Sequence, residues 1–164
     1  MLNRTYDSQV CSIARTLEVL GERWTLLIVR DAMLGLRRFD EFQHSLGIAR
    51  NVLTDRLKLL VEAGVLERIE YQKRPPRFEY RLTAVGLELC TPVIGLMHWG
   101  DRHRAGPDGL PRLTRHHACG GQLHAELVCE ECGATVTATD LDLQPGPGLR
   151  ADPVAAVSSR VTTR

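Results

Sequence analysis

The chain has 164 residues, of which 43% are hydrophobic and 25% charged, as in an ordinary soluble globular protein. A typical domain holds roughly 100–150 residues, so this length fits one domain with an appendage. Residues 1–10 contain no apolar run like that of a secretory signal, and no stretch approaches the ~18 consecutive apolar residues of a membrane-spanning helix. We therefore expect a cytoplasmic protein with no membrane partner. In that reducing compartment its five cysteines should form no disulfide framework.

The formal net charge of +1 does not indicate a nucleic-acid partner, but the charges are unevenly distributed along the chain. Residues 37–81 hold ten Lys or Arg against seven Asp or Glu, whereas residues 126–152 hold six acids against one base. A basic middle followed by an acidic C-terminal part predicts two regions that face different partners.

Four helices are predicted in the first part of the chain, each followed by a glycine. Residues 11–20 and 24–34 carry apolar side chains at helical spacing. Asp40 and Gln43 are typical of a capping box, which would open a short third helix. A fourth helix should cover residues 50–63. The closing glycines are Gly21, Gly35, Gly47 and Gly64.

The fourth helix has an apolar side and a polar side, because successive residues lie about 100° apart around a helix. The apolar side carries Leu53, Leu57 and Leu60. The polar side carries Asn51, Thr54, Asp55 and Lys58, with Arg50 and Arg56 flanking it. Such a helix fits the major groove of B-form DNA, where Asn51 can pair with adenine and Arg50 and Lys58 can contact guanine or phosphate. The alternative is a solvated helix face.

After Gly64 the apolar period changes to two, which predicts a β-hairpin with Ile69 and Tyr71 in one strand and residues 77–82 in the other. The sequence Lys73-Arg74-Pro75-Pro76 does not join a strand ladder easily, so it should form the tip. Lys73, Arg74 and Arg77 can neutralise phosphates beside the helix or enter the minor groove. A solvated turn is again the alternative.

Thr83 can cap a final long helix, which Pro92 should kink or restart and which fades into a linker at residues 103–107. The apolar stripe of this helix comprises Leu87, Cys90, Ile94, Met97 and Trp99. This is more apolar surface than one small domain needs, which favours an interface between two subunits. Alternatively the outer members of the stripe belong to the core of one chain, as we expect for Cys90.

Two short helices joined by a glycine turn, the second polar outside, and a basic hairpin follow the order of a winged helix-turn-helix. Several motifs lie in this region: Cys11-Ser12-Ile13-Ala14, Leu20-Gly21-Glu22-Arg23-Trp24-Thr25-Leu26-Leu27-Ile28, Arg37-Arg38-Phe39, Asn51-Val52-Leu53-Thr54-Asp55-Arg56-Leu57 and residues 71–80. Together they resemble the HxlR family of bacterial transcriptional regulators, over roughly residues 11–100.

The resemblance implies a mostly α-helical winged helix-turn-helix homodimer on an inverted-repeat DNA operator, and we expect a repressor. It implies that the first and last helices build the dimer, that the helix from Arg50 enters the major groove and that the hairpin is the wing. The family often has Ser or Thr where this chain has Ala49, which cannot cap the helix, at a cost of ~0.5–2 kcal/mol. The DNA-contacting candidates are Arg38, Arg50, Asn51, Thr54, Asp55, Arg56, Lys58, Lys73, Arg74 and Arg77.

Cys11 opens the first helix, where the positive end of the helix dipole favours a reactive thiolate. Some members of the family that the chain resembles sense oxidants or electrophiles through a cysteine at this place. Cys11 is therefore a candidate redox sensor. The alternative is a small hydrophobic residue packed at the dimer interface.

The C-terminal part contains two matching motifs, His116-x-x-Cys119-Gly120 and Cys129-x-x-Cys132-Gly133. The glycine after each second ligand permits a tight turn that aims both ligands at one point. Four such N and S ligands close the shell of a structural Zn²⁺ ion in a zinc ribbon. We predict that zinc binds His116, Cys119, Cys129 and Cys132, with His117 and His124 as rivals for the histidine position. A metal-free hairpin is the alternative.

The predicted organisation is a winged-helix domain at residues 1–106, a zinc-ribbon-like β segment at 107–145 and a disordered tail at 146–164. The chain has no His-Glu-x-x-His motif, no P-loop and no glycine-rich dinucleotide motif, so we expect no enzyme. A protein-interaction module that docks through its acidic part is the remaining alternative.

Overall fold

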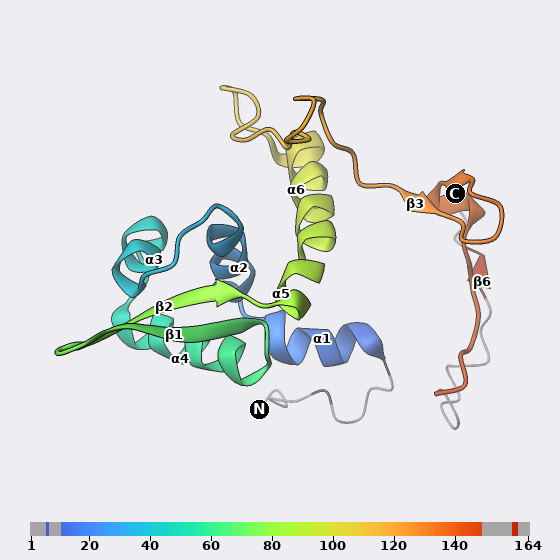
Figure 1. Cartoon of the computed structure of the whole chain (residues 1–164). Helices are drawn as coiled ribbons and strands as arrows, with labels where there is room; N and C mark the ends of the chain where they lie inside the picture. The colour runs from blue at the N-terminus through green and yellow to red at the C-terminus, as the bar shows by residue number, and fades with distance from the viewer. Residues whose placement is uncertain (1–5, 7–10, 149–158, 161–164) are drawn as a thin grey trace.

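The computed structural model describes residue 6, residues 11–148 and the backbone of residues 159–160. Figure 1 shows a helical body with a long β-hairpin on one side and a C-terminal segment whose later part extends away on the other. We call residues 11–104 the body and residues 105–148 the C-terminal segment. The body contains α1 (Ser12–Leu20), α2 (Thr25–Met33), α3 (Phe39–Leu46), α4 (Arg50–Glu62), β1 (Leu66–Lys73), β2 (Pro76–Leu82), α5 (Ala84–Glu88) and α6 (Cys90–Arg104). The predicted winged helix-turn-helix is confirmed.

The core of the body lies where α2, α3 and α4 meet the start of the hairpin. Leu53, Leu57 and Leu60 are at most 1% exposed, as their spacing on α4 predicted. Burying one such side chain contributes about 1.5–3 kcal/mol. The other buried members of this core are Leu20, Ile28, Val29, Phe42, Ile48, Val65 and Leu66. The packing fixes α4 with its opposite side toward solvent.

The start of α3 differs from the prediction. The expected capping box at Asp40 and Gln43 is wrong, because the helix begins at Phe39 and it is Glu41 that accepts hydrogen bonds from backbone N–H groups before the helix. The physical reason lies outside the helix: Arg38 is extended and pairs with Glu79 of β2 as an isolated β-bridge. This pairing sets the first helical residue.

The hairpin and the last helices agree with the sequence pattern, except at the hairpin tip. Strands β1 and β2 are antiparallel, as predicted. The four-residue tip predicted at Lys73-Arg74-Pro75-Pro76 is wrong at both ends, because Lys73 and Pro76 pair as the last and first residues of the two strands and only Arg74-Pro75 forms the turn. Pro76 can do so because it is the first residue of its strand, where proline is tolerated. The hydroxyl of Thr83 accepts from the Gly86 N–H at 3.1 Å and caps α5. Helix α6 then starts at Cys90, which places Pro92 in a first turn, where a missing N–H costs little. Pro92 therefore marks a restart, one of the two outcomes expected for it.

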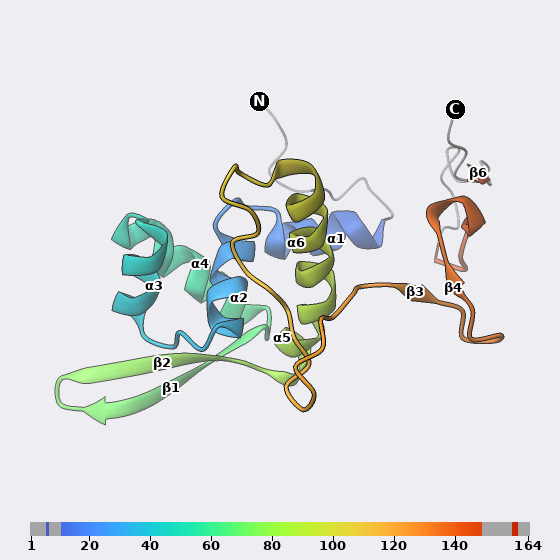
Figure 2. The ribbon, with the colours of Figure 1, turned by 90° about the horizontal axis from the view of Figure 1, so that it is seen from above.

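The C-terminal segment contains only short elements: β3 (Leu127–Val128), β4 (Thr135–Val136), the 3₁₀ helix η1 (Ala138–Asp140) and β5 (Asp142–Leu143). A strand β6 (Ser159–Arg160) pairs antiparallel with β5. Figures 1 and 2 both show β3 and the elements after it lying apart from the helices. The tail predicted to be disordered falls mostly outside the described residues. In the described part of the chain, no helix is long and apolar enough to cross a membrane.

Candidate nucleic-acid interface

Helices α3 and α4 form the helix-turn-helix. Gly47 ends α3 at a φ of 59°, a conformation that favours glycine, and buried Ile48 ties the turn to the core. Ala49 precedes α4 in an extended conformation and makes no side-chain cap, as its methyl group dictates. The turn thus sets α4 across α3 without help from a polar cap.

The outer face of α4, which we define as Asn51, Thr54, Asp55 and Lys58, is exposed, as its position opposite the buried leucines requires. The Thr54 hydroxyl donates to the Arg50 carbonyl at 2.9 Å, and the Lys58 ammonium lies 3.7 Å from the Glu62 carboxylate. The amide of Asn51 lies near the start of the helix, from which side chains reach base edges in helix-turn-helix proteins.

Arg56 is placed differently from the other candidates on α4. Its side chain is only 25% exposed, and its Nη2 lies 3.8 Å from the Glu22 carboxylate in the loop before α2. This arginine is positioned to hold α4 against the body, so its guanidinium is less available to DNA than that of Arg50, which is 73% exposed.

A cleft of about 550 Å³ lies between the starts of α3 and α4 and the hairpin. Three predicted DNA contacts, Arg38, Arg50 and Arg77, line it. Aromatic rings support two of them: the Arg50 guanidinium lies 4.6 Å from the Phe39 ring centre and that of Arg38 lies 4.9 Å from that of Tyr71. Such stacking holds a guanidinium in place while its edge can still donate to oxygen acceptors such as phosphate. Each of the two also lies near one carboxylate, Arg50 Nη1 at 4.0 Å from that of Asp40 and Arg38 Nε at 3.6 Å from that of Glu79. We call this cleft the arginine cleft.

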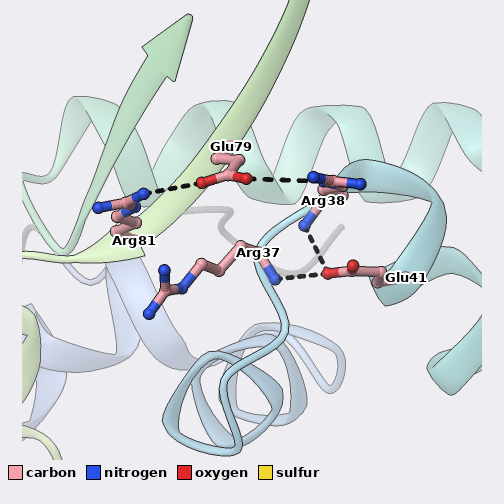
Figure 3. A network of polar contacts seen from close by, with 5 residues as sticks. All are labelled: Arg37, Arg38, Glu41, Glu79 and Arg81. Carbon is pink, nitrogen blue, oxygen red and sulfur yellow. Dashed lines mark hydrogen bonds and ion pairs between the residues drawn. The ribbon is translucent and has the colours of Figure 1, made fainter. Parts of the chain in front are cut away.

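A polar network anchors the hairpin at the edge of the arginine cleft (Figure 3). The Glu79 carboxylate on β2 accepts from Arg81 Nη2 at 2.9 Å and lies 3.6 Å from Arg38 Nε. The Tyr80 N–H also donates to the Arg37 carbonyl at 2.7 Å. Together these bonds join the hairpin to the residues before α3, so the wing and the helix-turn-helix keep a fixed relation.

Both carboxylates of this network are stabilised in the charged form. The backbone N–H groups of Arg37 and Arg38 donate to Glu41 at 2.8 and 2.9 Å and lower the pKa of its carboxyl. The hydrogen bond from Arg81, with the nearby charge of Arg38, lowers the pKa of Glu79. Both groups therefore bind their partners as anions at neutral pH.

The tip of the wing carries the remaining basic candidates. Lys73, Arg74 and Arg77 are all exposed. Figures 1 and 2 show the hairpin reaching outward beside α3 and α4. Arg77 of β2 lines the arginine cleft together with Arg50 at the start of α4, so the cleft joins the wing to the helix that carries the outer face.

The sequence did not predict the residues that support the basic side chains of this surface, namely Phe39, Glu41, Tyr71, Glu79 and Arg81. The Arg37-Arg38-Phe39 motif is visible in the sequence, but Tyr71 and Glu79, which contact Arg38, lie in strands far along the chain. Glu79 alternates with Phe78 and Tyr80, a pattern typical of a solvent-facing strand position. Only the fold brings it to Arg38.

The first and last helices present apolar side chains to solvent. Ile13 of α1 is 71% exposed, and α6 buries no residue at all. Cys90, expected in the core, is only half-buried. Cys11 is exposed at the N-cap of α1.

The predicted zinc ligands form two separate pairs. In the first pair, the His116 Nδ1 lies 3.2 Å from the Cys119 Sγ. In the second pair, the pKa of the Cys129 thiol is lowered by hydrogen bonds from the backbone N–H groups of Cys132 and Glu131 and from the Cys132 side chain. His124 lies instead beside His98, with ring centres 6.5 Å apart. Within residues 11–148, no three His, Cys, Asp or Glu side chains gather closely enough to hold a metal ion. The four-ligand site stays a prediction.

A helix-turn-helix with an exposed polar second helix and a basic wing defines the class of winged-helix transcriptional regulators. Residues 19–107 match the model of the HxlR-like helix-turn-helix family, and the chain therefore belongs to that family. This confirms the resemblance seen in the sequence, and with it the expectation of a regulator and not an enzyme.

Relatives and solved structures resemble the chain over different shares of its length. The uncharacterised transcriptional regulator Rv3095 of Mycobacterium tuberculosis is 46% identical over 140 residues, which are 85% of this chain and 89% of Rv3095. The solved structure of PA1607, provisionally described as a transcription factor, covers 83% of this chain and 95% of its own, with 35% identity and a TM-score of 0.73. The redox regulator HypR in its reduced form covers 57% of this chain and 94% of its own, with 32% identity and a TM-score of 0.55.

Proposed function

We propose that this regulator is a sequence-specific repressor that binds an inverted-repeat operator as a homodimer in the bacterial cytoplasm. The observation that carries the proposal is that the arginine cleft joins the wing to α4, whose outer face is exposed. The helix supplies groups for base edges, while the arginines and Lys73 supply cations for the phosphates on either side. Asp55 can accept from cytosine on the same face.

Homodimerisation through α1 and α6 fits the exposed apolar side chains of these helices. A partner would cover Ile13 and Leu17 of α1 and Leu96 and Trp99 of α6, which are 40–71% exposed. Several large apolar side chains exposed on two helices favour an interaction site over a free face. A two-fold dimer would also place two α4 helices on one side, as an inverted repeat requires.

The direct test is fluorescence anisotropy of the full chain with labelled DNA from upstream of its own coding region. We expect tight binding to one inverted repeat, with an affinity that falls steeply as salt rises because counterions are released from the phosphates. Shuffling the repeat while keeping its composition provides the matched control. Weak binding that ignores the shuffling would indicate a protein-interaction module and overturn the proposal. Transcription from the same promoter should fall when the protein is added, and a rise would make it an activator.

We propose in addition that a disulfide between the Cys11 thiol and a second thiol, formed when an oxidant such as diamide takes up two electrons and two protons, alters DNA binding. The thiol is exposed and lies at the start of α1, next to the apolar face assigned to the dimer. The similarity to HypR, a redox regulator solved in reduced and oxidised forms, supports this role. Diamide should change the DNA affinity of the wild type but not of a Cys11→Ser variant. An equal response of both, or of neither, would exclude Cys11 as the sensor.

A further inference from the structure

The C-terminal segment lacks a hydrophobic core. No residue between 105 and 148 is buried, and Leu127, Val128 and Leu143 are 56–62% exposed. In a segment of this size, apolar burial does not usually offset the conformational entropy lost on folding, and small folds of this kind are held by disulfides or metal ions. What holds this segment must therefore be sought in its polar and sulfur-containing groups.

The segment contains two β-hairpins whose tips have the same backbone structure. In the first tip, residues 116–121, the His116 N–H donates to the Gly121 carbonyl at 2.7 Å and the Gly120 N–H donates back to His116 at 2.8 Å. In the second tip, residues 129–134, the Cys129 N–H donates to the Ala134 carbonyl and the Gly133 N–H donates back to Cys129, both at 2.9 Å. Each bond of one tip has its counterpart at the same spacing in the other.

The resemblance extends to the flanking strands and to the glycines. Arg115 pairs with Gln122 around the first tip, as Val128 pairs with Thr135 around the second. Gly120 and Gly133 have φ angles of 71° and 69°, which a residue with a Cβ adopts only with strain. Hairpin loops of one length often share a backbone pattern, so the agreement matters through what the two tips carry: each has a His or Cys at its first position and a Cys three residues later.

Each tip also brings its two ligand atoms together. The His116 Nδ1 and the Cys119 Sγ are 3.2 Å apart, close to the roughly 3.6 Å that separates N and S ligands on a tetrahedral zinc ion. The Gly121 N–H points at the Cys119 sulfur at 3.4 Å, an arrangement that stabilises the charge of a metal-bound thiolate. Cys129 and Cys132 occupy the corresponding positions of the second tip.

We propose that the two tips close on one structural Zn²⁺ ion held by His116, Cys119, Cys129 and Cys132. One nitrogen and three sulfur ligands suit zinc and leave no open position for catalysis. The first hairpin ends at Leu123, whose N–H donates to the Thr114 carbonyl, and the second begins at Leu127. Closure thus requires the exposed connection at residues 124–126 to bend, because the ligand pairs are separate in the structure.

The comparison with Rv3095 agrees with a distinct folded unit in this part of the chain. Its alignment spans 140 residues, whereas the family match ends at residue 107, so the alignment must include part of the C-terminal segment. The zinc site does not depend on the proposed operator binding, and either can fail while the other stands.

The test is the zinc content of the full chain purified without chelators, measured by elemental analysis. We expect about one zinc ion per chain, and its loss in a Cys129→Ser, Cys132→Ser double variant. A Cys11→Ser, Cys90→Ser double variant, which removes two thiols from the body, is the matched control and should keep the metal. His116→Ala should also lose zinc, while His117→Ala and His124→Ala should retain it.

A second measurement separates a specific site from a folding defect. Titration of the metal-stripped chain with Co²⁺ should give the strong visible absorption of a tetrahedral site together with a sulfur-to-cobalt charge-transfer band. Circular dichroism of the variants should show the helices of the body intact. Substoichiometric zinc in the wild type, zinc retained by the Cys129 and Cys132 variants, or an octahedral cobalt spectrum would each overturn the proposal.

Discussion

The body and the C-terminal segment reach an ordered structure by different physical means. The body packs ten core residues around α2, α3 and α4, and its hairpin is joined to the helices by paired backbone and by the Glu79 network. The C-terminal segment buries nothing and relies on two backbone turns of identical pattern. A regulator can thus combine a DNA-binding unit that is stable by packing with an appendage that has no buried core residue.

The largest expected effect of a single substitution falls in the core of the body. Leu53→Ala should lower the free energy of unfolding by about 2–5 kcal/mol, because Leu53 is fully buried and its removal leaves a cavity. Urea unfolding followed by circular dichroism measures this. Leu127→Ala in the C-terminal segment, where the leucine is 56% exposed, is the matched control and should change it by less than about 0.5 kcal/mol. Equal effects at both positions would remove the distinction between the two regions.

The next effect concerns DNA binding, which we assign to the body alone. Asn51→Ala on α4 should reduce discrimination between operator and altered sequences by about 1–3 kcal/mol, because the amide can contact a base edge. Lys73→Ala at the wing should weaken binding to every sequence about equally and reduce the salt dependence. Anisotropy with the operator and with single-base variants of it separates the two patterns. If both variants bind like the wild type, the reading surface lies elsewhere.

The sequence predicted the body well because its signals are local. Leucines at helical spacing on α4 and the change of period at the hairpin identified elements whose burial the structure confirms. The exposure of Asn51 and Lys58 followed from the same periodicity. A helix or strand with one buried face leaves a pattern that needs no partner to be recognised.

The remaining features could not be predicted because they depend on contacts between distant parts of the chain. The start of α3 is set by the pairing of Arg38 with Glu79 of β2, so a local capping pattern at Asp40 gave the wrong position. The helical spacing of Arg56 placed it beside the DNA-facing set, but its contact with Glu22, distant in the sequence, holds it against the body. The spacing of His and Cys residues in the sequence predicted two pairs of zinc ligands, but it could not show that the two pairs lie apart in the fold.

A smaller and pH-dependent effect is expected from the Glu79 network. The pKa of Glu79 is lowered in the folded chain by Arg81 and Arg38, so its contribution to stability is complete above the ordinary glutamate pKa of about 4.3. That contribution is lost as the pH falls through the lowered value. Glu79→Gln should therefore shift the urea midpoint of unfolding at pH 7 and much less near pH 3. Glu70→Gln on the exposed face of β1 is the control. A Glu79→Gln shift that is the same at both pH values would mean that the carboxylate charge plays no part.

The smallest effect on stability and on operator affinity is expected from deletion of residues 126–164. The second hairpin, β3 with β4, lies apart from the helices in Figures 1 and 2, and the deletion leaves Ala125, which lies beside Gly95 of α6, in place. We expect the urea unfolding of the body to change by no more than about 0.5 kcal/mol and operator affinity to stay the same, while zinc binding is lost. A marked loss of stability would show that the second hairpin packs on the body or on a second subunit once zinc is bound. In that case metal binding and DNA binding would be coupled through α6, because the first hairpin contacts that helix by the 3.0 Å bond between His98 and Thr114.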